Sequence, residues 1–487
     1  MALLPKKWIF FLVVFSLAGN VKSQYLDSLL YLRSFTKAEL DSTVDDAGIP
    51  SAFVGNTYDI DVYKVVYRSV SYDSTAISAS GLLAFPRNAN CKFPLLSYSH
   101  GTKVEREKVP SKLSGTESLI GLIIASNGYV TTLPDYIGLG NSPLSILHLS
   151  NHASTLASSG IDLLRAVREA SPQAGFRLNG QLFITGYSEG GYAAMCIHRK
   201  IEKSLNAEFT VTASAPMSGA YDLSGTMYNL VLSYASHPNP LFLPYLIFSW
   251  NQKYHFYTQP GQYFTAPYDT VLPPLFDGFH DDNTINLACA DTPRLMLQQT
   301  LIDSMQSDSN HIFRMALKEN DAYTGWVPQA PVKLFFCKGD NTVPWQNAEV
   351  AYNNLVAAGC SVCDTVNVSS SADHVACAQF AVLYTKSFFE GLKIIDSCQA
   401  SSINSVSKSR INCYPNPAID MVNLRMPADL SSIEYTIYNT QGIKVIERNM
   451  NVKSDEYKID ISSLSGGVYF LSLHTTKGVF YARFLKQ

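Results

Sequence analysis

The segment GYSEG at residues 186–190 constrains the fold of this chain most strongly. It directly follows the apolar run 182–184 and precedes a stretch, 191–205, whose apolar residues have helical spacing. A serine on a sharp strand-to-helix turn needs small residues two positions before and after it, because a Cβ there would block the turn. Glycine fills both positions. The segment therefore predicts a nucleophile elbow that displays Ser188 at the end of a strand.

Short apolar segments alternate with helical patterns on both sides of this elbow. The alternation predicts an α/β fold with a mostly parallel sheet and helices on both faces, in which ligands bind at the carboxyl ends of the strands. Strands are expected at 60–70, 75–85, 93–99, 129–133, 181–185, 210–216, 332–337 and 365–369. Helices are expected at 25–45, 117–127, 152–170, 192–205, 345–358 and 375–392.

The alternation stops between residues 218 and 330, in a segment rich in Tyr, Phe, Leu and Pro. An insertion of this size between two strands predicts a small cap subdomain rather than a loop. Two interpretations of its apolar side chains stay open. They could line an apolar substrate pocket, or they could form the core of the cap itself.

The chain changes character after Cys398. Residues 399–412 are rich in Ser and poor in apolar residues, which predicts a linker between the α/β domain at 24–398 and a tail domain at 413–487. The tail has strand-like runs separated by Gly and Ser turns, which predicts a small antiparallel β-sandwich without a catalytic cluster. Its runs are 433–438, 443–446, 468–474 and 479–484.

Two later residues complete a serine-hydrolase constellation. A serine hydroxyl becomes an effective nucleophile when a histidine takes its proton, and that histidine needs a carboxylate to orient it and stabilise its cation. With this elbow the chain order is serine, acid, histidine. Asp340 follows a predicted strand at its carboxyl end, whereas the rival acids Asp364 and Asp373 do not. His374 is the expected base, because the other histidine after Asp340, His474, lies in the tail.

The same chemistry requires fixed donors for a tetrahedral oxyanion. One is expected to be the backbone N–H of Glu189, the residue after the nucleophile. The other is expected from the loop after the strand at 93–99, through the amide of Gly101 or Thr102. His100 in that loop precedes the acid and is interpreted as structural. No cofactor and no metal is expected.

Composition and the first residues bound the location and the partners. The formal net charge is -3 and charged residues make up 16%, so nucleic acid is not an expected partner. Residues 1–23 combine Lys6 and Lys7 with a short apolar run and a small-residue site, which predicts a cleaved signal peptide rather than a retained anchor. No later apolar run is long enough for a membrane span, so the mature form is expected to have no transmembrane anchor.

Nine cysteines in an exported chain favour disulfides, with at least one cysteine unpaired. Cys196 and Cys337 lie in apolar segments and are interpreted as small buried hydrophobic residues. Cys360 and Cys363 have the spacing CxxC, which could instead begin a zinc site, but no second close Cys or His pair follows them. Bridges are expected within the later set, Cys360, Cys363, Cys377, Cys398 and Cys413.

Taken together, several motifs resemble the secretory lipase family of α/β-hydrolases. They are YSHGT at 98–102, PDYIGLG at 134–140, GYSEGG at 186–191, GWVP at 325–328 and GDNTVP at 339–344. The resemblance covers roughly residues 24–398. It implies an α/β-hydrolase fold with a helical cap over an acyl pocket, and a carboxylic-ester hydrolase with Ser188, Asp340 and His374 at the triad positions. Glu189 departs from the glutamine common in fungal members.

The tail resembles a second family. The segment YPNP at 414–417, the turn at Gly442, the segment GVYF at 467–470 and the basic last strand are similar to the C-terminal sorting domain of type IX secretion cargo. The resemblance implies recognition by the outer-membrane secretion machinery of a Gram-negative bacterium, with the domain cleaved afterwards. A carbohydrate-binding or adhesive sandwich is the alternative.

The leading hypothesis is a secreted serine carboxylic-ester hydrolase, an esterase or lipase that forms an acyl-enzyme at Ser188. Its substrate is expected to be a small-molecule or polymeric ester, and its location the medium or the cell surface. A serine peptidase of the same fold shares the triad and is the alternative. Peptidases of this fold usually add a propeller or a carboxylate pair for a free amino terminus, and neither is seen in the sequence. A non-catalytic surface adhesin is the third hypothesis.

Overall fold

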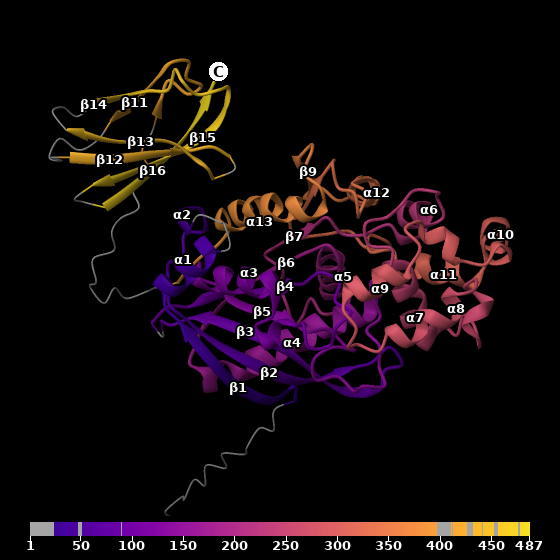
Figure 1. The fold of residues 1–487 in the computed structure, drawn as a ribbon. Helices are drawn as coiled ribbons and strands as arrows, with labels where there is room; N and C mark the ends of the chain where they lie inside the picture. The colour runs from indigo at the N-terminus through magenta and orange to yellow at the C-terminus, as the bar shows by residue number, and fades with distance from the viewer. Residues whose placement is uncertain are drawn as a thin grey trace, which may run out of the picture. The chain divides into compact units, whose positions relative to one another are not determined.

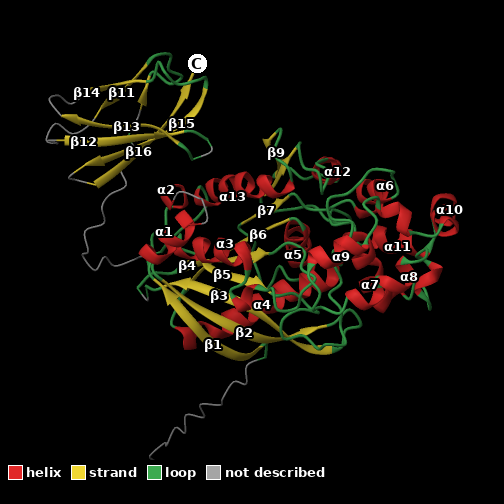
Figure 2. Ribbon diagram, viewed as in Figure 1, coloured by secondary structure: helices red, strands yellow, loops and turns green. Residues whose placement is uncertain are grey.

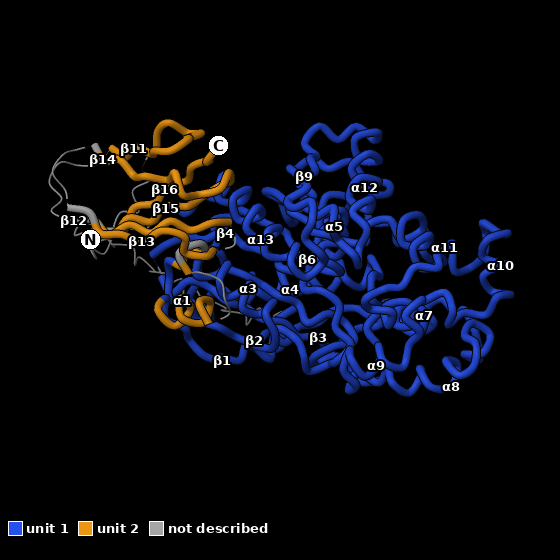
Figure 3. Tube along the Cα trace, turned by 45° about the horizontal axis from the view of Figure 1, so that its top comes forward, with its two compact units in different colours: residues 1–37, 57–397 blue, residues 38–56, 398–487 orange. Residues whose placement is uncertain are grey.

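The computed structural model describes residues 24–46, 51–88, 90–396, 411, 413–425, 432–440, 442–451, 456–475 and 478–487. The predicted signal peptide, and the predicted linker apart from Ile411, lie outside these residues. The chain divides into two compact units (Figure 3). The first comprises residues 1–37 and 57–397, and the second comprises residues 38–56 and 398–487, so the helices α1 (Lys37–Asp46) and α2 (Ser51–Val54) fall largely in the second unit.

A nine-stranded sheet forms the centre of the first unit, in the order β1-β2-β3-β5-β4-β6-β7-β8-β9 (Figure 1). Strands β1 to β3 pair antiparallel and β3 joins β5 antiparallel, whereas all pairs from β5 to β9 are parallel. This confirms the predicted mostly parallel sheet. The strands are β1 (Leu26–Phe35), β2 (Ile60–Val70), β3 (Ala76–Pro86), β4 (Phe93–Ser99), β5 (Val130–Pro134), β6 (Leu178–Tyr187), β7 (Ala213–Met217), β8 (Val332–Cys337) and β9 (Cys363–Ser369).

The expected helix at 25–45 was wrong in its first half, which is the edge strand β1. Register shifts between Leu26 and Ser28 and between Tyr31 and Arg33 mark two irregularities where β1 pairs with β2. They break the two-residue alternation of a strand, so the half-buried residues Leu26, Leu29 and Leu32 recur every third position. That spacing resembles the period of a helix, which explains the error.

Helices cover both faces of the sheet, as predicted (Figure 2). Helices α4 (Ala153–Ala174) and α5 (Glu189–Ser204) pack together on one face, where a side chain at Gly160 would collide with Ile197. Helices α3 (Gly115–Ser126) and α13 (His374–Glu390) lie on the opposite face, and α12 (Gln346–Ala357) packs beside β8 and β9. Phe183 and Phe335 on the central strands are fully buried, and each such side chain contributes about 1.5–3 kcal/mol of hydrophobic stabilisation.

The predicted cap is present as a set of helices between β7 and β8 (Figure 2). Three contacts from α7 attach it to the loops at the carboxyl ends of the strands. The Tyr245 hydroxyl donates to Lys103 O at 3.0 Å, the Trp250 indole donates to Ser150 O at 2.8 Å, and Gln252 bonds both backbone groups of Leu147. The cap helices are α6 (Tyr228–Val231), α7 (Phe242–Tyr254), α8 (Tyr268–Val271), α9 (Asp282–Ala288), α10 (Gln299–Ser307) and α11 (Ile312–Glu319).

The C-terminal part of the second unit is the predicted antiparallel sandwich. A three-stranded sheet, β10-β11-β14, and a four-stranded sheet, β13-β12-β15-β16, share one core that includes Val422, Ile437 and Leu471. The strands are β10 (Cys413–Tyr414), β11 (Met421–Arg425), β12 (Ser432–Tyr438), β13 (Lys444–Asn451), β14 (Glu456–Asp460), β15 (Gly467–Thr475) and β16 (Gly478–Lys486).

The cysteine predictions are confirmed in part. Cys360 and Cys363 form a disulfide. Cys337 was expected to be an unbonded buried residue, but it is bonded to Cys377, because the carboxyl end of β8 lies beside the first turn of α13. Cys413 was expected in a bridge and is free, and no other described cysteine lies in its unit.

Candidate active site

The elbow at Ser188 has the strained backbone that a displayed nucleophile requires. Ser188 lies between β6 and α5 with φ 60° and ψ -123°, and its amide donates to Met217 O on the neighbouring strand at 3.0 Å. A Cβ at Gly190 would collide with the carbonyl of Ser99, and one at Gly186 would collide with the carbonyl of Gly190. Glycine is therefore required at both positions, as the sequence pattern predicted.

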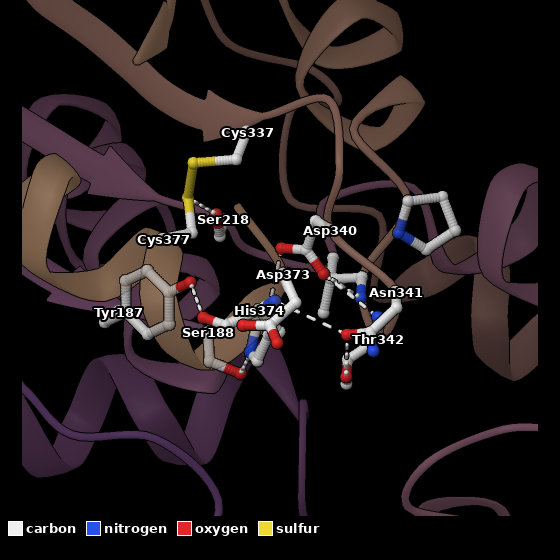
Figure 4. Close-up of polar contacts among 12 residues, drawn as sticks. Tyr187, Ser188, Ser218, Cys337, Asp340, Asn341, Thr342, Asp373, His374 and Cys377 are labelled. Atoms are coloured by element: carbon white, nitrogen blue, oxygen red, sulfur yellow. Dashed lines mark hydrogen bonds and ion pairs between the residues drawn. A yellow bond between two sulfur atoms is a disulfide. The ribbon is translucent and has the colours of Figure 1, made fainter. Parts of the chain in front are cut away.

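His374 and Asp340 complete a continuous series of hydrogen bonds to Ser188 (Figure 4). The Nε2 atom of His374 lies 2.9 Å from Ser188 Oγ, and its Nδ1 atom lies 2.7 Å from Asp340 Oδ2. The other oxygen of Asp340 accepts hydrogen bonds from the amides of Thr342 and Val343, at 3.0 and 2.8 Å. The aspartate side chain is 1% exposed and the histidine side chain 12% exposed, so this carboxylate is fixed and shielded from water.

The rival acids have other partners. Asp373 caps α13 by accepting a hydrogen bond from the amide of Ala376, and Asp364 forms an ion pair with Lys333. Neither carboxylate bonds His374 in the described structure. The placement of Asp340 at the end of a parallel strand thus distinguished it from both.

The predicted oxyanion loop lies directly beside the elbow, because β4 pairs with β6 so that Ser99 is opposite Gly186. The amide of Gly101, however, donates to Glu117 Oε1 at 2.6 Å and is already engaged. The amide of Thr102 has no acceptor in the described structure, and that of Glu189 begins a helix and likewise has none. Of the three candidate donors, Glu189 and Thr102 are therefore the available pair.

His100 has a structural environment, as expected. It is fully buried, its Nδ1 atom lies 2.6 Å from Gly101 O, and its backbone carbonyl accepts a hydrogen bond from the Tyr136 hydroxyl at 2.7 Å. Burial lowers the pKa of its imidazole. The neighbouring Asp135 accepts hydrogen bonds from Ser80 and from the amide of Ser111. Hydrogen bonds among these buried polar groups thus hold the loop that contains Thr102 in place.

The side chain of Glu189 begins a second buried network. Its Oε1 atom accepts from the amide of Asn151 at 2.8 Å and lies 3.0 Å from His148 Nε2. Burial works to raise the pKa of the Glu189 carboxyl, but the charge and hydrogen bond of His148, the Asn151 amide and the Thr102 hydroxyl outweigh it, and the pKa is lowered. The carboxylate is therefore ionised beside the candidate nucleophile.

A largely apolar cavity opens at Ser188, beneath the cap. Its polar lining residues include Thr102, Asn151, Ser188 and Glu189, and its walls come mainly from the cap. The apolar wall residues include Leu223, Met227, Val231, Leu243, Leu246, Phe313 and Leu317. Other apolar residues of the insertion, such as Trp250 and Ile302, are buried in its core. The apolar residues of the insertion therefore divide between the wall of this cavity and the core of the cap, and the binding of a substrate in the cavity stays a prediction.

Sequence reasoning missed three polar residues of this region, namely His148, Asn151 and His237. His237 Nδ1 accepts from the amide of Asn239, so its Nε2–H donates to Thr342 O at 3.1 Å, which attaches the cap to the loop after Asp340. No local motif marks these residues. The acidic residue inside the elbow was the one available signal, because a buried carboxylate needs a partner.

The described residues contain no cluster of His, Cys, Asp or Glu side chains that could hold a metal ion. None of the helices in the described ranges is both long and apolar enough to cross a bilayer.

The fold and the site define a capped α/β-hydrolase, and comparison with known structures agrees. A crystal structure of a hydrolase-like protein from Legionella pneumophila is 30% identical, with a TM-score of 0.70 over 78% of this chain and 100% of that one. The rice cell wall degrading esterase LipA from Xanthomonas oryzae is 27% identical, with a TM-score of 0.66 over 75% and 95% of the two chains. Candida antarctica lipase A shares the fold at 13% identity, with a TM-score of 0.53 over 75% and 82%.

The tail and the whole chain can then be assigned. Residues 412–487 match the family described as secretion system C-terminal sorting domain. No curated protein matches the chain. The chain belongs to the secretory lipase family of α/β-hydrolases and carries a C-terminal type IX sorting domain. The sorting domain implies interaction with a secretion machinery and a secreted or cell-surface location.

Proposed function

We propose that this protein is a serine carboxylic-ester hydrolase that acts outside the cell through Ser188, His374 and Asp340. The observation that carries the proposal is the unbroken series of hydrogen bonds from Ser188 Oγ through His374 to Asp340, at the mouth of an apolar cavity. Serine, histidine and aspartate side chains linked in this order form the arrangement that activates a serine for acyl transfer.

The proposed reaction has two halves. Ser188 Oγ attacks the ester carbonyl carbon while His374 Nε2 takes its proton, and the Asp340 carboxylate stabilises the imidazolium. The amides of Glu189 and Thr102 stabilise the oxyanion. The carbon–oxygen bond to the alcohol then breaks, and the alcohol leaves with the proton from His374. In the second half, water gives a proton to His374 and attacks the acyl-enzyme, which releases the acid and regenerates Ser188.

The cavity supports an ester with an apolar acyl group. Most of its lining residues are aliphatic or aromatic, and its polar lining residues include Thr102, Asn151 and Ser188 itself. An acyl chain would bury its apolar surface against Leu243, Leu246 and Phe313, with its carbonyl near Thr102. The similar Xanthomonas protein is an esterase that degrades rice cell wall, so cell-wall esters are natural substrates to test.

We further propose that the hydrolase comprises residues 24–398, that residues 1–23 are removed as a signal peptide, and that residues 413–487 direct export. The support is the confinement of all candidate catalytic side chains to the first unit, together with the sorting-domain match in the tail.

The proposal is tested by p-nitrophenyl ester hydrolysis with acyl groups from acetate to palmitate, with Ser188→Ala and Ser154→Ala measured alongside. Ser154 is an exposed serine at the start of α4 and controls for the loss of a hydroxyl. The expected result is hydrolysis that Ser188→Ala abolishes and Ser154→Ala retains. Hydrolysis by the Ser188→Ala variant at the wild-type rate would refute the proposal, and faster cleavage of a matched anilide than of the ester would favour a peptidase.

A further inference from the structure

The residue after the candidate nucleophile is the starting point for an inference about catalysis. The Glu189 residue is only 3% exposed, and it lines the same cavity as Ser188. An oxyanion formed at this place would face a fixed negative charge across a water-poor gap. Like charges in such an environment repel strongly, so an uncompensated Glu189 would oppose the transition state that the adjacent amide is placed to stabilise.

The hydrogen-bond partners of His148 supply the compensation. Its Nδ1 atom lies 2.9 Å from the carbonyl of Ile137, which can only accept a hydrogen bond. Its Nε2 atom lies 3.0 Å from Glu189 Oε1, which also accepts from the amide of Asn151. Both ring nitrogens therefore face acceptors, and both can donate a hydrogen bond only when His148 carries a proton on each nitrogen.

The surroundings hold the imidazole ring in this orientation. The ring of Tyr136 stacks on the imidazole, with ring centroids 5.3 Å apart and planes 9° from parallel. The ring centroid of Tyr245, on the cap, is 6.2 Å from that of His148. Both His148 and Glu189 are 1% exposed at their side chains, so solvent does not screen the interaction between them. Asn151, which contributes the third hydrogen bond, has a positive φ of 51° and lines the cavity.

We propose that His148 is a cationic positioning residue that neutralises Glu189 behind the oxyanion site, and that this buried pair holds Asn151 in place in the wall of the cavity that contains Ser188. The inference rests on the proposed ester hydrolysis, because it assigns His148 a role in that reaction. It identifies a fourth side chain on which catalysis depends, although His148 does not touch the reacting atoms.

A double-mutant cycle tests the proposal, with kcat, KM and thermal unfolding measured for each variant. His148→Phe keeps the stacked ring but removes the cation. The expected result is a loss in kcat of about 100-fold, comparable to the loss of one oxyanion donor, with KM changed by less than about threefold. Glu189→Gln removes the charge and is expected to lower kcat by up to about tenfold. In that background, His148→Phe is expected to cost less than about threefold more.

Each outcome decides between charge compensation and packing. Rescue of His148→Phe by Glu189→Gln supports the proposal, whereas equal losses in both backgrounds overturn it, because a packing role does not depend on the charge of Glu189. If His148→Phe alone does not fold, recovery of a cooperative thermal transition in the double variant supports the proposal, and failure of the double variant to fold overturns it. The wild type and Ser188→Ala are measured in parallel, so the absence of Ser188-dependent hydrolysis is recognised as failure of the proposed function.

Discussion

Removal of the Cys337–Cys377 disulfide is predicted to damage both stability and catalysis. Cys337 is three residues before the candidate acid Asp340, and Cys377 is three residues after the candidate base His374, so the bond joins the end of β8 to the first turn of α13. Both cysteines are fully buried. The Cys360–Cys363 disulfide is the matched control, because it lies at the amino end of β9, away from the end that His374 follows.

The expected magnitudes follow from the lengths of the closed loops. The sequence separations are 40 for Cys337–Cys377 and 3 for Cys360–Cys363. In the chain-entropy treatment, these loops correspond to about 4 and about 2 kcal/mol of stabilisation. For a unit of this size, the losses lower Tm by about 5 °C and about 2 °C. A shift of the acid relative to the base by about 1 Å would also lower kcat by up to about 100-fold.

The assay compares the double variants Cys337→Ala/Cys377→Ala and Cys360→Ala/Cys363→Ala with the wild type, by thermal unfolding and by ester hydrolysis. The first variant is expected to show the larger decrease in Tm and a lower kcat than the wild type. The second variant is expected to keep a kcat within about twofold of the wild type. The reasoning would be refuted by a first variant that unfolds at the same temperature as the second, or that hydrolyses esters at the wild-type kcat.

Three further predictions concern the acid, the cavity and the pH dependence of stability. Asp340→Asn should lower kcat by about 10⁴-fold, measured by steady-state kinetics. Asp373→Ala should leave kcat within a few fold, and it should cost about 1 kcal/mol of unfolding free energy, measured by denaturant titration, because a helix cap is lost. Leu246→Trp should fill the cavity and move the acyl-length optimum of p-nitrophenyl esters towards acetate, and an unchanged profile would place the acyl group elsewhere. Burial works to raise the pKa of Glu202, but His198 and backbone amides outweigh it and hold the pKa at about 2, below the ordinary 4.5. A lowered carboxyl pKa stabilises the fold above the unfolded value, so the Tm advantage of the wild type over Glu202→Gln should be full above about pH 5 and fade towards pH 2; a constant difference would contradict this.

The local parts of the site were predictable because short segments determine them. The elbow is specified within a few residues by the clash that any Cβ at Gly186 or Gly190 would create. Asp340 was identified by its place at the end of β8. His374 was identified because few histidines follow Asp340 in the chain. The placement of Asp340 requires only the rule that the carboxyl ends of parallel strands share one edge of the sheet.

The remaining features depend on contacts between distant segments. Glu117 is 16 residues from Gly101, and its hold on the Gly101 amide cannot be read from the loop sequence. His148 is 41 residues from Glu189, and its pairing follows from how the loop after β5 packs beneath the elbow. The strand β1 was mistaken for a helix because irregularities in its pairing with β2 altered the spacing of its partly buried residues.

The bonding of Cys337 illustrates the same limit. Its apolar strand predicted burial correctly, but a buried cysteine and a buried half-cystine have the same local sequence. Only the packing of α13 against β8 brings Cys377 within bonding distance.

The most direct test of the central claim is to identify the residue that becomes acylated. Incubation with diethyl p-nitrophenyl phosphate, followed by peptide mass spectrometry, reports which side chain attacks an ester-like centre. The proposed function predicts stoichiometric release of p-nitrophenol, a diethylphosphoryl group on Ser188, complete loss of ester hydrolysis and no labelling of Ser188→Ala. Modification of a different residue, or ester hydrolysis that persists after Ser188 is fully modified, would contradict it.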